Sequence, residues 1–132
     1  MEELKNLTQE QINEAVVKNA EGLSLKMGRK VYGLMLNTAG MDRTDGEWVI
    51  GYYYEPSLYQ KMTILDHVDK DKTLKGFQLL EQNLIKEHSD ARLINKEDSN
   101  NHNVIIGASL AIVGKSLDFA INQVKDLKKN GE

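Results

Sequence analysis

Cysteine is absent from this 132-residue chain, and proline occurs only once, as Pro56. Without cysteine the protein has no disulfide framework and no thiolate metal site. The three histidines, His67, His88 and His102, have no second histidine at metal-ligand spacing, and no His-Glu-x-x-His pattern occurs. These absences remove the common sequence signatures of metalloenzymes, and we expect neither a metal nor a cofactor.

An excess of positive charge is also missing, because 17 Lys and Arg residues stand against 20 Asp and Glu residues. Nucleic-acid-binding domains usually carry a clustered basic excess, so we expect no nucleic-acid partner. The longest uncharged apolar run, residues 104–114, is shorter than the roughly 20 residues that span a bilayer as a helix. The first residues lack the pattern of a signal peptide. We therefore expect a cytoplasmic protein that makes no membrane contact.

Two short motifs come near to catalytic signatures, and both fail. Gly114-Lys115-Ser116 resembles the end of a phosphate-binding loop, but Ser109 stands where that motif needs its first glycine. Gly107-Ala108-Ser109 lacks the second glycine of a nucleophile elbow. Both motifs also fall inside a predicted helix, whereas each needs a strand before it. We expect that the protein is not an enzyme.

What the sequence does contain is a pair of strand-like segments. Residues 31–36 and 48–54 are rich in the aliphatic and aromatic side chains that favour strands. Between them, residues 38–46 hold glycine and aspartate, which are typical of turns. Pro56 cannot donate a backbone hydrogen bond, so the second strand should end before it. The pattern predicts an antiparallel hairpin with a long, polar and mobile loop.

The first of several helical patterns begins at Thr8. Thr8 followed by Gln11 is a capping box, in which each side chain bonds the backbone N–H of the other residue. Gly22 is a suitable end for this helix. We expect its apolar face to consist of Ile12, Ala15, Val16 and Ala20. Two roles stay open for this amphipathic segment, residues 1–22: docking on its own domain, or serving as an interaction arm.

Two shorter helices are predicted after the hairpin. Ser57 and Gln60 repeat the capping box and start a helix that should end near His67. Its apolar face should be Leu58, Met62 and Leu65. The next helix should start at Asp69 or Asp71, with a face formed by Leu74, Phe77, Leu80 or Glu81, and Leu84. Gly76 within it predicts a close backbone approach to a neighbour, and residues 92–94 are a candidate short strand.

The longest helix is expected over residues 103–129 and should be the main cover of one face of the hairpin. Its apolar stripe advances in steps of four and three residues: Ile106, Leu110, Val113, Leu117, Ile121, Val124 and Leu127. Beside the stripe, Gly107, Ala111 and Gly114 form a row of small side chains. Together these patterns predict one α+β domain over residues 1–132, with a hairpin or small sheet packed against several helices.

Aromatic side chains are concentrated on the hairpin, where they suit a protein interface and ordinary sheet packing equally well. If helices cover only one face, Tyr52 and Tyr54 need cover from another chain, and we expect a homo-oligomer. The candidate partner-binding residues combine the first helix, the hairpin aromatics and the small row: Ile12, Val16, Trp48, Tyr52, Tyr53, Tyr54, Gly107, Ala111 and Gly114.

The order of these elements resembles that of small phage and prophage proteins of tail assembly. The resemblance covers residues 30–117 and is carried by residues 50–57, Ile-Gly-Tyr-Tyr-Tyr-Glu-Pro-Ser, by the helix of residues 75–85, and by the acidic turn at Ser89-Asp90. It implies a non-enzymatic chaperone that binds and holds a tail tube or tape-measure protein in the host cytoplasm. The alternative is a small oligomeric binding or structural module of unknown partner, including a component of the virion.

Overall fold

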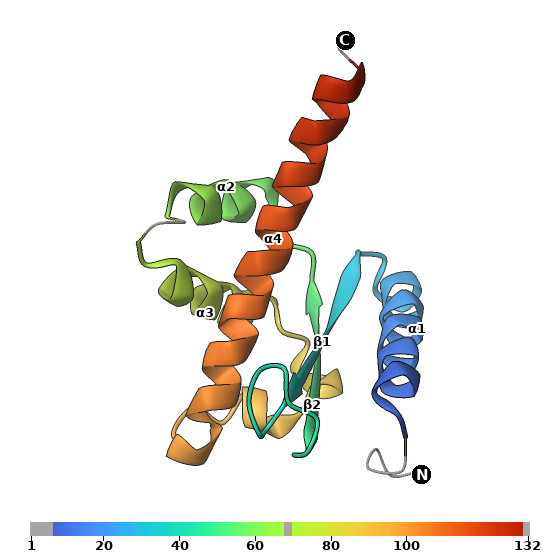
Figure 1. Ribbon diagram of the computed structural model, residues 1–132, viewed down its shortest axis with the longest axis vertical. Helices are drawn as coiled ribbons and strands as arrows, with labels where there is room; N and C mark the ends of the chain where they lie inside the picture. Colours follow the sequence, from blue (N-terminus) through green and yellow to red (C-terminus); the bar gives the residue numbers. More distant parts are fainter. Residues whose placement is uncertain (1–6, 68–69, 131–132) are drawn as a thin grey trace.

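The protein is a two-stranded antiparallel sheet held between helices (Figure 1). The computed structural model describes residues 7–67 and 70–130, with side chains up to Asp118. The predicted α+β class is confirmed. In chain order the elements are α1 (Gln9–Met27), β1 (Val31–Asn37), β2 (Trp48–Tyr54), α2 (Leu58–Asp66), α3 (Lys72–Asn83), the 3₁₀ turns η2 (Lys86–His88), η3 (Ala91–Leu93) and η4 (Ser99–Asn101), and α4 (His102–Asn130).

Both faces of the hairpin are covered, which differs from the expected cover on one face. The register runs from Val31 opposite Tyr54 to Asn37 opposite Trp48. One face packs against α3 and α4 and contributes Leu34, Val49 and Tyr53 to that core. The other face contributes Val31 and Tyr52 and packs against Ile12, Val16 and Ala20 of α1. Tyr52 is thus covered within the monomer, and the hairpin gives no reason for a second chain.

Helix α1 packs along one face of the hairpin as part of the domain. The predicted capping box of Thr8 and Gln11 is present. The helix does not end at Gly22 but continues to Gly28, whose left-handed backbone (φ 67°) closes it. The longer helix lies along β1, where a Cβ atom at Gly33 would collide with the side chain of Val16. A glycine in the strand therefore allows helix and strand to approach closely.

Helices α3 and α4 are in close contact, as the position of Gly76 predicts. A Cβ atom there would collide with the backbone carbonyl oxygen of Ser109. This contact places Ser109 and Val113 against α3. Val113 is buried and Leu117 packs on the core as predicted, whereas Ile106 is 48% exposed. The buried residues of α4 are Val104, Ile105, Ala108, Ser109, Ile112, Val113 and Ser116. The side chains of Ile121, Val124 and Leu127 lie outside the described residues.

Helix α2 presents to solvent the face that was expected to be buried. Its capping box of Ser57 and Gln60 is present, but the Gln60 side chain also bonds Gln82 and Asn83. This anchor turns Ile64 into the core, where it is 1% exposed. The predicted face is exposed instead: Leu58, Met62 and Leu65.

The remaining predictions concern the segment from α3 to η3. Helix α3 begins after Asp71, one of the two expected starts, and its Leu74 is 62% exposed rather than buried. Residues 92–94 do not form a strand, because Ala91–Leu93 is a 3₁₀ turn capped by the Asp90 side chain. Among the described residues, no helix is both long and apolar enough to cross a membrane.

Candidate functional site

The outer edge of β2 is closed by an irregular segment that runs beside it. The Ile85 N–H donates to the Tyr52 carbonyl oxygen at 2.8 Å, and the Asp90 N–H donates to the Ile50 carbonyl oxygen at 2.9 Å. The Tyr52 N–H donates to Ser89 Oγ at 3.0 Å. This segment thus takes the place of a third strand without forming regular pairing.

In the described part of the chain, the outer edge of β1 is open. The bonds from the Thr38 N–H to the Glu47 carbonyl and from the Glu55 N–H to the Lys30 carbonyl flank the ladder. In an antiparallel pair such bonded positions alternate with positions whose backbone faces outward. Gly33 and Met35 are therefore outward positions. Within the described part of the chain, no N–H or C=O of these two residues has a hydrogen-bond partner outside the ladder.

Accessibility at this edge is greatest in the middle of the strand. The Val31 N–H, the first outward donor, is covered by Ser24 Oγ of α1 at 2.9 Å. Gly33 is exposed and Met35 is half-buried. A strand edge with free donors and acceptors is a template for pairing with another chain, and proteins usually cover or charge such edges. This one carries neither a charge nor a proline between Val31 and Asn37.

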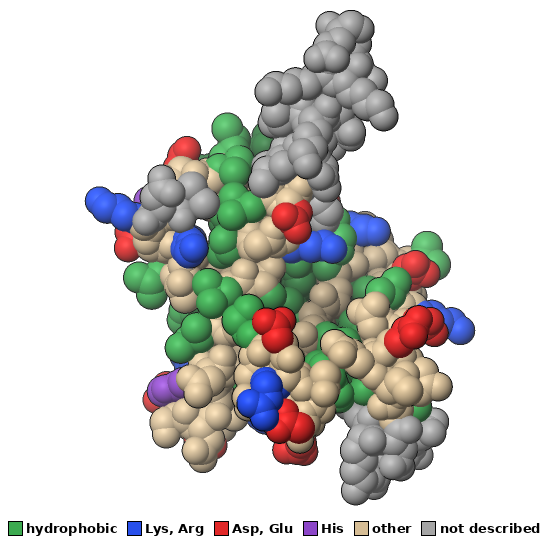
Figure 2. All heavy atoms as spheres, viewed as in Figure 1, with side chains coloured by type: hydrophobic (Ala, Val, Ile, Leu, Met, Phe, Trp, Pro, Cys, Tyr) green, Lys and Arg blue, Asp and Glu red, His purple; other side chains and the backbone are tan. Residues whose placement is uncertain are grey.

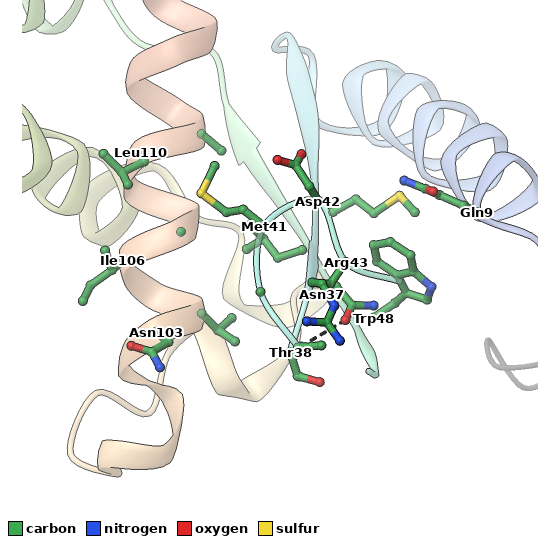
Figure 3. A pocket seen from close by; sticks show the side chains of 17 residues that line it. Gln9, Asn37, Thr38, Met41, Asp42, Arg43, Trp48, Asn103, Ile106 and Leu110 are labelled. Atoms are coloured by element: carbon green, nitrogen blue, oxygen red, sulfur yellow. Dashed lines mark hydrogen bonds between the residues drawn. The ribbon is translucent and has the colours of Figure 1, made fainter. Parts of the chain in front are cut away.

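A cavity of about 580 Å³ borders the end of this open edge. Figure 3 shows it between the hairpin loop and α4, with Trp48 and Gln9 on the side of α1. Its volume falls in the range of about 300–1,000 Å³ that is typical of binding pockets. The apolar part of its lining comes from the hairpin and α4: Met35, Leu36, Ala39, Met41, Trp48, Val104, Ile106, Gly107, Leu110 and Ala111.

The hairpin loop that forms one wall is shaped by Asn37, a polar side chain that is only 8% exposed. Asn37 Oδ1 accepts from the N–H groups of Ala39 and Gly46, both at 3.0 Å. At the surface of the loop, Arg43 makes two hydrogen bonds to Asp45. The predicted polar loop therefore has a defined hydrogen-bonded form, and it holds Met41 at the cavity with 72% of its surface exposed.

The opposite wall is α4, where small residues leave room. A Cβ atom added to Gly107 would lie 3.4 Å from Cδ2 of Leu36 in β1. Ala111 follows one turn later and is exposed. Figure 3 shows Met41 reaching from the loop toward α4, while Ile106 and Leu110 lie on α4 itself. A larger residue at position 107 or 111 would fill the space between the helix and the loop.

The nine residues expected to bind a partner are dispersed by the fold. Trp48, Gly107 and Ala111 come together in the cavity. Gly114 lies on α4 outside its lining, and Tyr54 is half-buried with the Arg29 guanidinium 3.9 Å above its ring. The other four are buried inside the monomer and present no surface there: Ile12, Val16, Tyr52 and Tyr53.

Several lining residues escaped the sequence analysis. Met35 and Met41 have no pattern of their own, because a strand edge and a loop tip are recognised only in three dimensions. For Asn37, by contrast, a signal did exist. Asparagine at the end of a strand, before a loop rich in glycine, is a common organiser of turns through its side-chain oxygen.

The cavity offers binding groups more than groups for chemistry. Its ionisable lining residues are Asp42 and Arg43, both exposed, and Arg43 is engaged by Asp45. Elsewhere, burial and a hydrogen bond to Glu55 raise the pKa of Tyr32 to about 12. Burial also raises the pKa of Tyr53. Both phenols stay protonated at neutral pH, so neither serves as a base.

Within the described residues, no group of three or more His, Asp or Glu side chains is arranged to hold a metal ion. Comparison of the chain with protein-family models, curated proteins and solved structures found no match. Function must therefore be inferred from the geometry of this site: an open strand edge, an apolar cavity at its end, and a shaped loop beside it.

Proposed function

We propose that this protein is a non-enzymatic assembly factor that binds an extended apolar segment of another protein along β1. The observation that carries the proposal is the open edge at Gly33 and Met35, which have outward backbone donors and acceptors without partners in the described chain. A strand added there would satisfy these groups through main-chain hydrogen bonds, as in other proteins that bind peptides by strand addition.

The cavity supplies what main-chain bonding lacks, which is selectivity for side chains. In an added strand, alternate side chains point to opposite faces of the sheet. Those directed toward α4 would meet the space left by Gly107 and Ala111, between Leu36 and Met41. This apolar lining favours large apolar side chains. The flexible side chain of Met41 can adapt to apolar side chains of different shapes. The partner segment is thus a strand with apolar residues at alternate positions.

The class of partner follows from the sequence resemblance. Proteins of phage and prophage tail assembly suggest a tail tube or tape-measure protein, held in the host cytoplasm until it polymerises. Unassembled tube subunits and long coiled-coil proteins expose apolar segments, which makes temporary cover useful. Binding an extended segment along an open edge would provide that cover without any chemical step.

Co-expression with the products of neighbouring tube and tape-measure genes, followed by affinity capture, tests the proposal. We expect the unaltered protein to retain one of them. Met35→Pro removes the outward N–H and should lose the partner, whereas Met35→Leu keeps the N–H and should retain it. Ala111→Phe fills the cavity and should also weaken capture, while Gly114→Phe, on the same helix outside the lining, should not.

If Met35→Pro retains as much partner protein as the unaltered protein does, strand addition is contradicted. Failure of the unaltered protein to retain either gene product would contradict the tail-assembly role. Each variant should first be shown to keep the native circular dichroism spectrum and melting temperature, so that loss of binding reports on the site and not on unfolding.

A further inference from the structure

A second surface stands apart from the cavity, on helix α2. Four of the nine residues of this helix are large apolar side chains that face solvent: Leu58 at 75%, Tyr59 at 81%, Met62 at 56% and Leu65 at 42% exposure. Figure 2 shows apolar side chains gathered over α2. Together these four residues are called the α2 face.

The α2 face is not explained by the folding of the monomer. Ile64 is the residue by which α2 enters the core, and Gln60 ties the helix to α3 through Gln82 and Asn83. The helix is therefore anchored without using its apolar side. Scattered exposed apolar residues are ordinary, but a contiguous patch of them indicates an interaction site.

We propose that the α2 face is the contact surface between two copies of this chain, paired antiparallel about a twofold axis near Met62. Such an axis requires the same patch on both partners. Leu58 and Leu65 lie on either side of Met62 along one side of the helix, so an antiparallel copy places apolar residues opposite apolar residues.

Charge supports this pairing. The exposed charged residue at the end of the α2 face is Asp66, at the C-terminal end of the helix. An antiparallel partner would place Asp66 near the N-terminus of the other α2, after Ser57, where exposed N–H groups favour negative charge. A parallel pair would bring the two carboxylates together, which is unfavourable. Lys61, the other charged residue of α2, is engaged by Glu55 at 3.4 Å, so the carboxylate of Asp66 is the charge that favours the antiparallel arrangement.

The available area is enough for a modest dimer. With about 200 Å² for a large, fully exposed side chain, the α2 face presents roughly 500 Å² per copy. Two copies would then bury about 1,000 Å², which is at the lower limit for a specific interface. We therefore expect a dimer that dissociates on dilution.

Because the chain has no cysteine, a single introduced thiol reports directly on this geometry. Met62→Cys near the axis should form a disulfide-linked dimer rapidly under mild oxidation. Leu25→Cys, at 87% exposure on α1, is the matched control and should cross-link slowly, through random collision. In sedimentation velocity from micromolar to several hundred micromolar protein, the unaltered chain should rise above its monomer mass of 14.9 kDa. Met62→Lys should stay monomeric.

Equal cross-linking of the two cysteine variants, or a monomer mass at every concentration, would overturn the proposal. Protection of the α2 face only in a complex with another protein would do the same and would assign the face to that protein. The result is independent of the proposed function, because Met35→Pro changes the β1 edge alone and should leave Met62→Cys cross-linking intact.

Discussion

The two outer edges of the hairpin differ in how their backbone groups are satisfied. At β2, the carbonyl oxygens of Ile50 and Tyr52 accept from Asp90 and Ile85, and the Tyr52 N–H donates to Ser89. At β1, Ser24 covers Val31, and the outward groups further along have no partner in the described chain. The fold thus satisfies the backbone groups of one edge with an irregular segment and leaves those of the other edge unsatisfied within the described residues. This difference between the two edges needs an explanation.

The comparison also shows why the open edge remains stable. A two-stranded sheet is marginal in water by itself, but here α1 covers one face while α3 and α4 cover the other (Figure 1). The covered faces hold β1 in place, and its edge is then free to pair. The side chains on the two faces of β1 thus stabilise the fold, while the backbone groups on its outer edge stay available for binding.

The largest expected effect comes from disrupting the contact between α1 and the face of the hairpin that it covers. Ile12→Asp places a charge where the side chain is 0% exposed, which should lower the free energy of unfolding by about 4 kcal/mol or more. The control, Val17→Asp, alters a half-exposed residue of the same helix and should cost far less. Urea denaturation measures both. Similar stability of the two variants would mean that α1 does not pack on the hairpin and is instead a detached interaction arm.

Ser89→Ala breaks the closed edge and should have the next largest effect. The variant leaves the Tyr52 N–H without its acceptor in a partly buried place. An unsatisfied buried donor costs about 1–3 kcal/mol in the free energy of unfolding. Ser99→Ala, an exposed serine in η4, is the control. If thermal melts show the two variants to be equally stable, the Ser89 bond does not close the edge.

A smaller effect is expected from pH at the Asp90 anchor. Burial acts to raise the pKa of the Asp90 carboxyl, but the hydrogen bonds and charge of Arg92 outweigh it and lower the pKa below its ordinary value. A carboxyl whose pKa is lower in the folded than in the unfolded state stabilises the fold above its unfolded pKa. That contribution is lost as the pH falls through the folded pKa.

Urea denaturation of the unaltered protein and of Asp90→Asn checks this dependence. The stability difference between them should be full at neutral pH and should shrink as the solution is acidified below about pH 4, where the unfolded carboxyl titrates. We expect a smaller change than for Ser89→Ala, since the carboxyl is partly exposed to solvent. A difference that stays constant down to the lowest pH at which the protein folds would show that the Asp90–Arg92 pair does not support the closed edge.

The smallest effect on stability is expected at the open edge. Met35→Pro removes an N–H that bonds nothing in the described chain, and proline is tolerated at edge positions whose N–H faces solvent. The loss in free energy of unfolding should be small and should come from the half-buried Met35 side chain, not from a broken hydrogen bond. Leu34→Pro is the comparison, since its N–H lies within the ladder to Gly51, and it should be much less stable. Equal losses would place Met35 inside a hydrogen-bonded pair.

Local signals in the sequence predicted much of this fold. The two capping boxes and the hairpin depend on neighbouring residues, and all three are confirmed. The face of α2 was predicted wrongly and that of α4 only in part, because each depends on which helix it contacts. Val113 is buried and Leu117 packs on the core as predicted, whereas Ile106 is exposed. Gly76 indicated a close approach but not its partner, and that partner, Ser109, determines which side of α4 is buried.

The candidate site was less accessible to sequence reasoning. Residues 31–36 were predicted to be a strand, yet nothing in these residues tells which edge of the hairpin is covered. That depends on Ile85 and Asp90, which reach β2 through an irregular segment without strand periodicity. The cavity likewise joins Met41 of a loop to Ala111 of a helix, two residues far apart in the chain.

Amide hydrogen exchange along β1, followed by NMR, tests the central claim most directly. In the free protein, the N–H groups of Gly33 and Met35 should exchange rapidly, while those of Leu34 and Leu36, bonded within the ladder, should be protected. In the complex retained on co-expression, Gly33 and Met35 should become protected as well. Equal protection of all four amides in the free protein, or no added protection in the complex, would contradict the account.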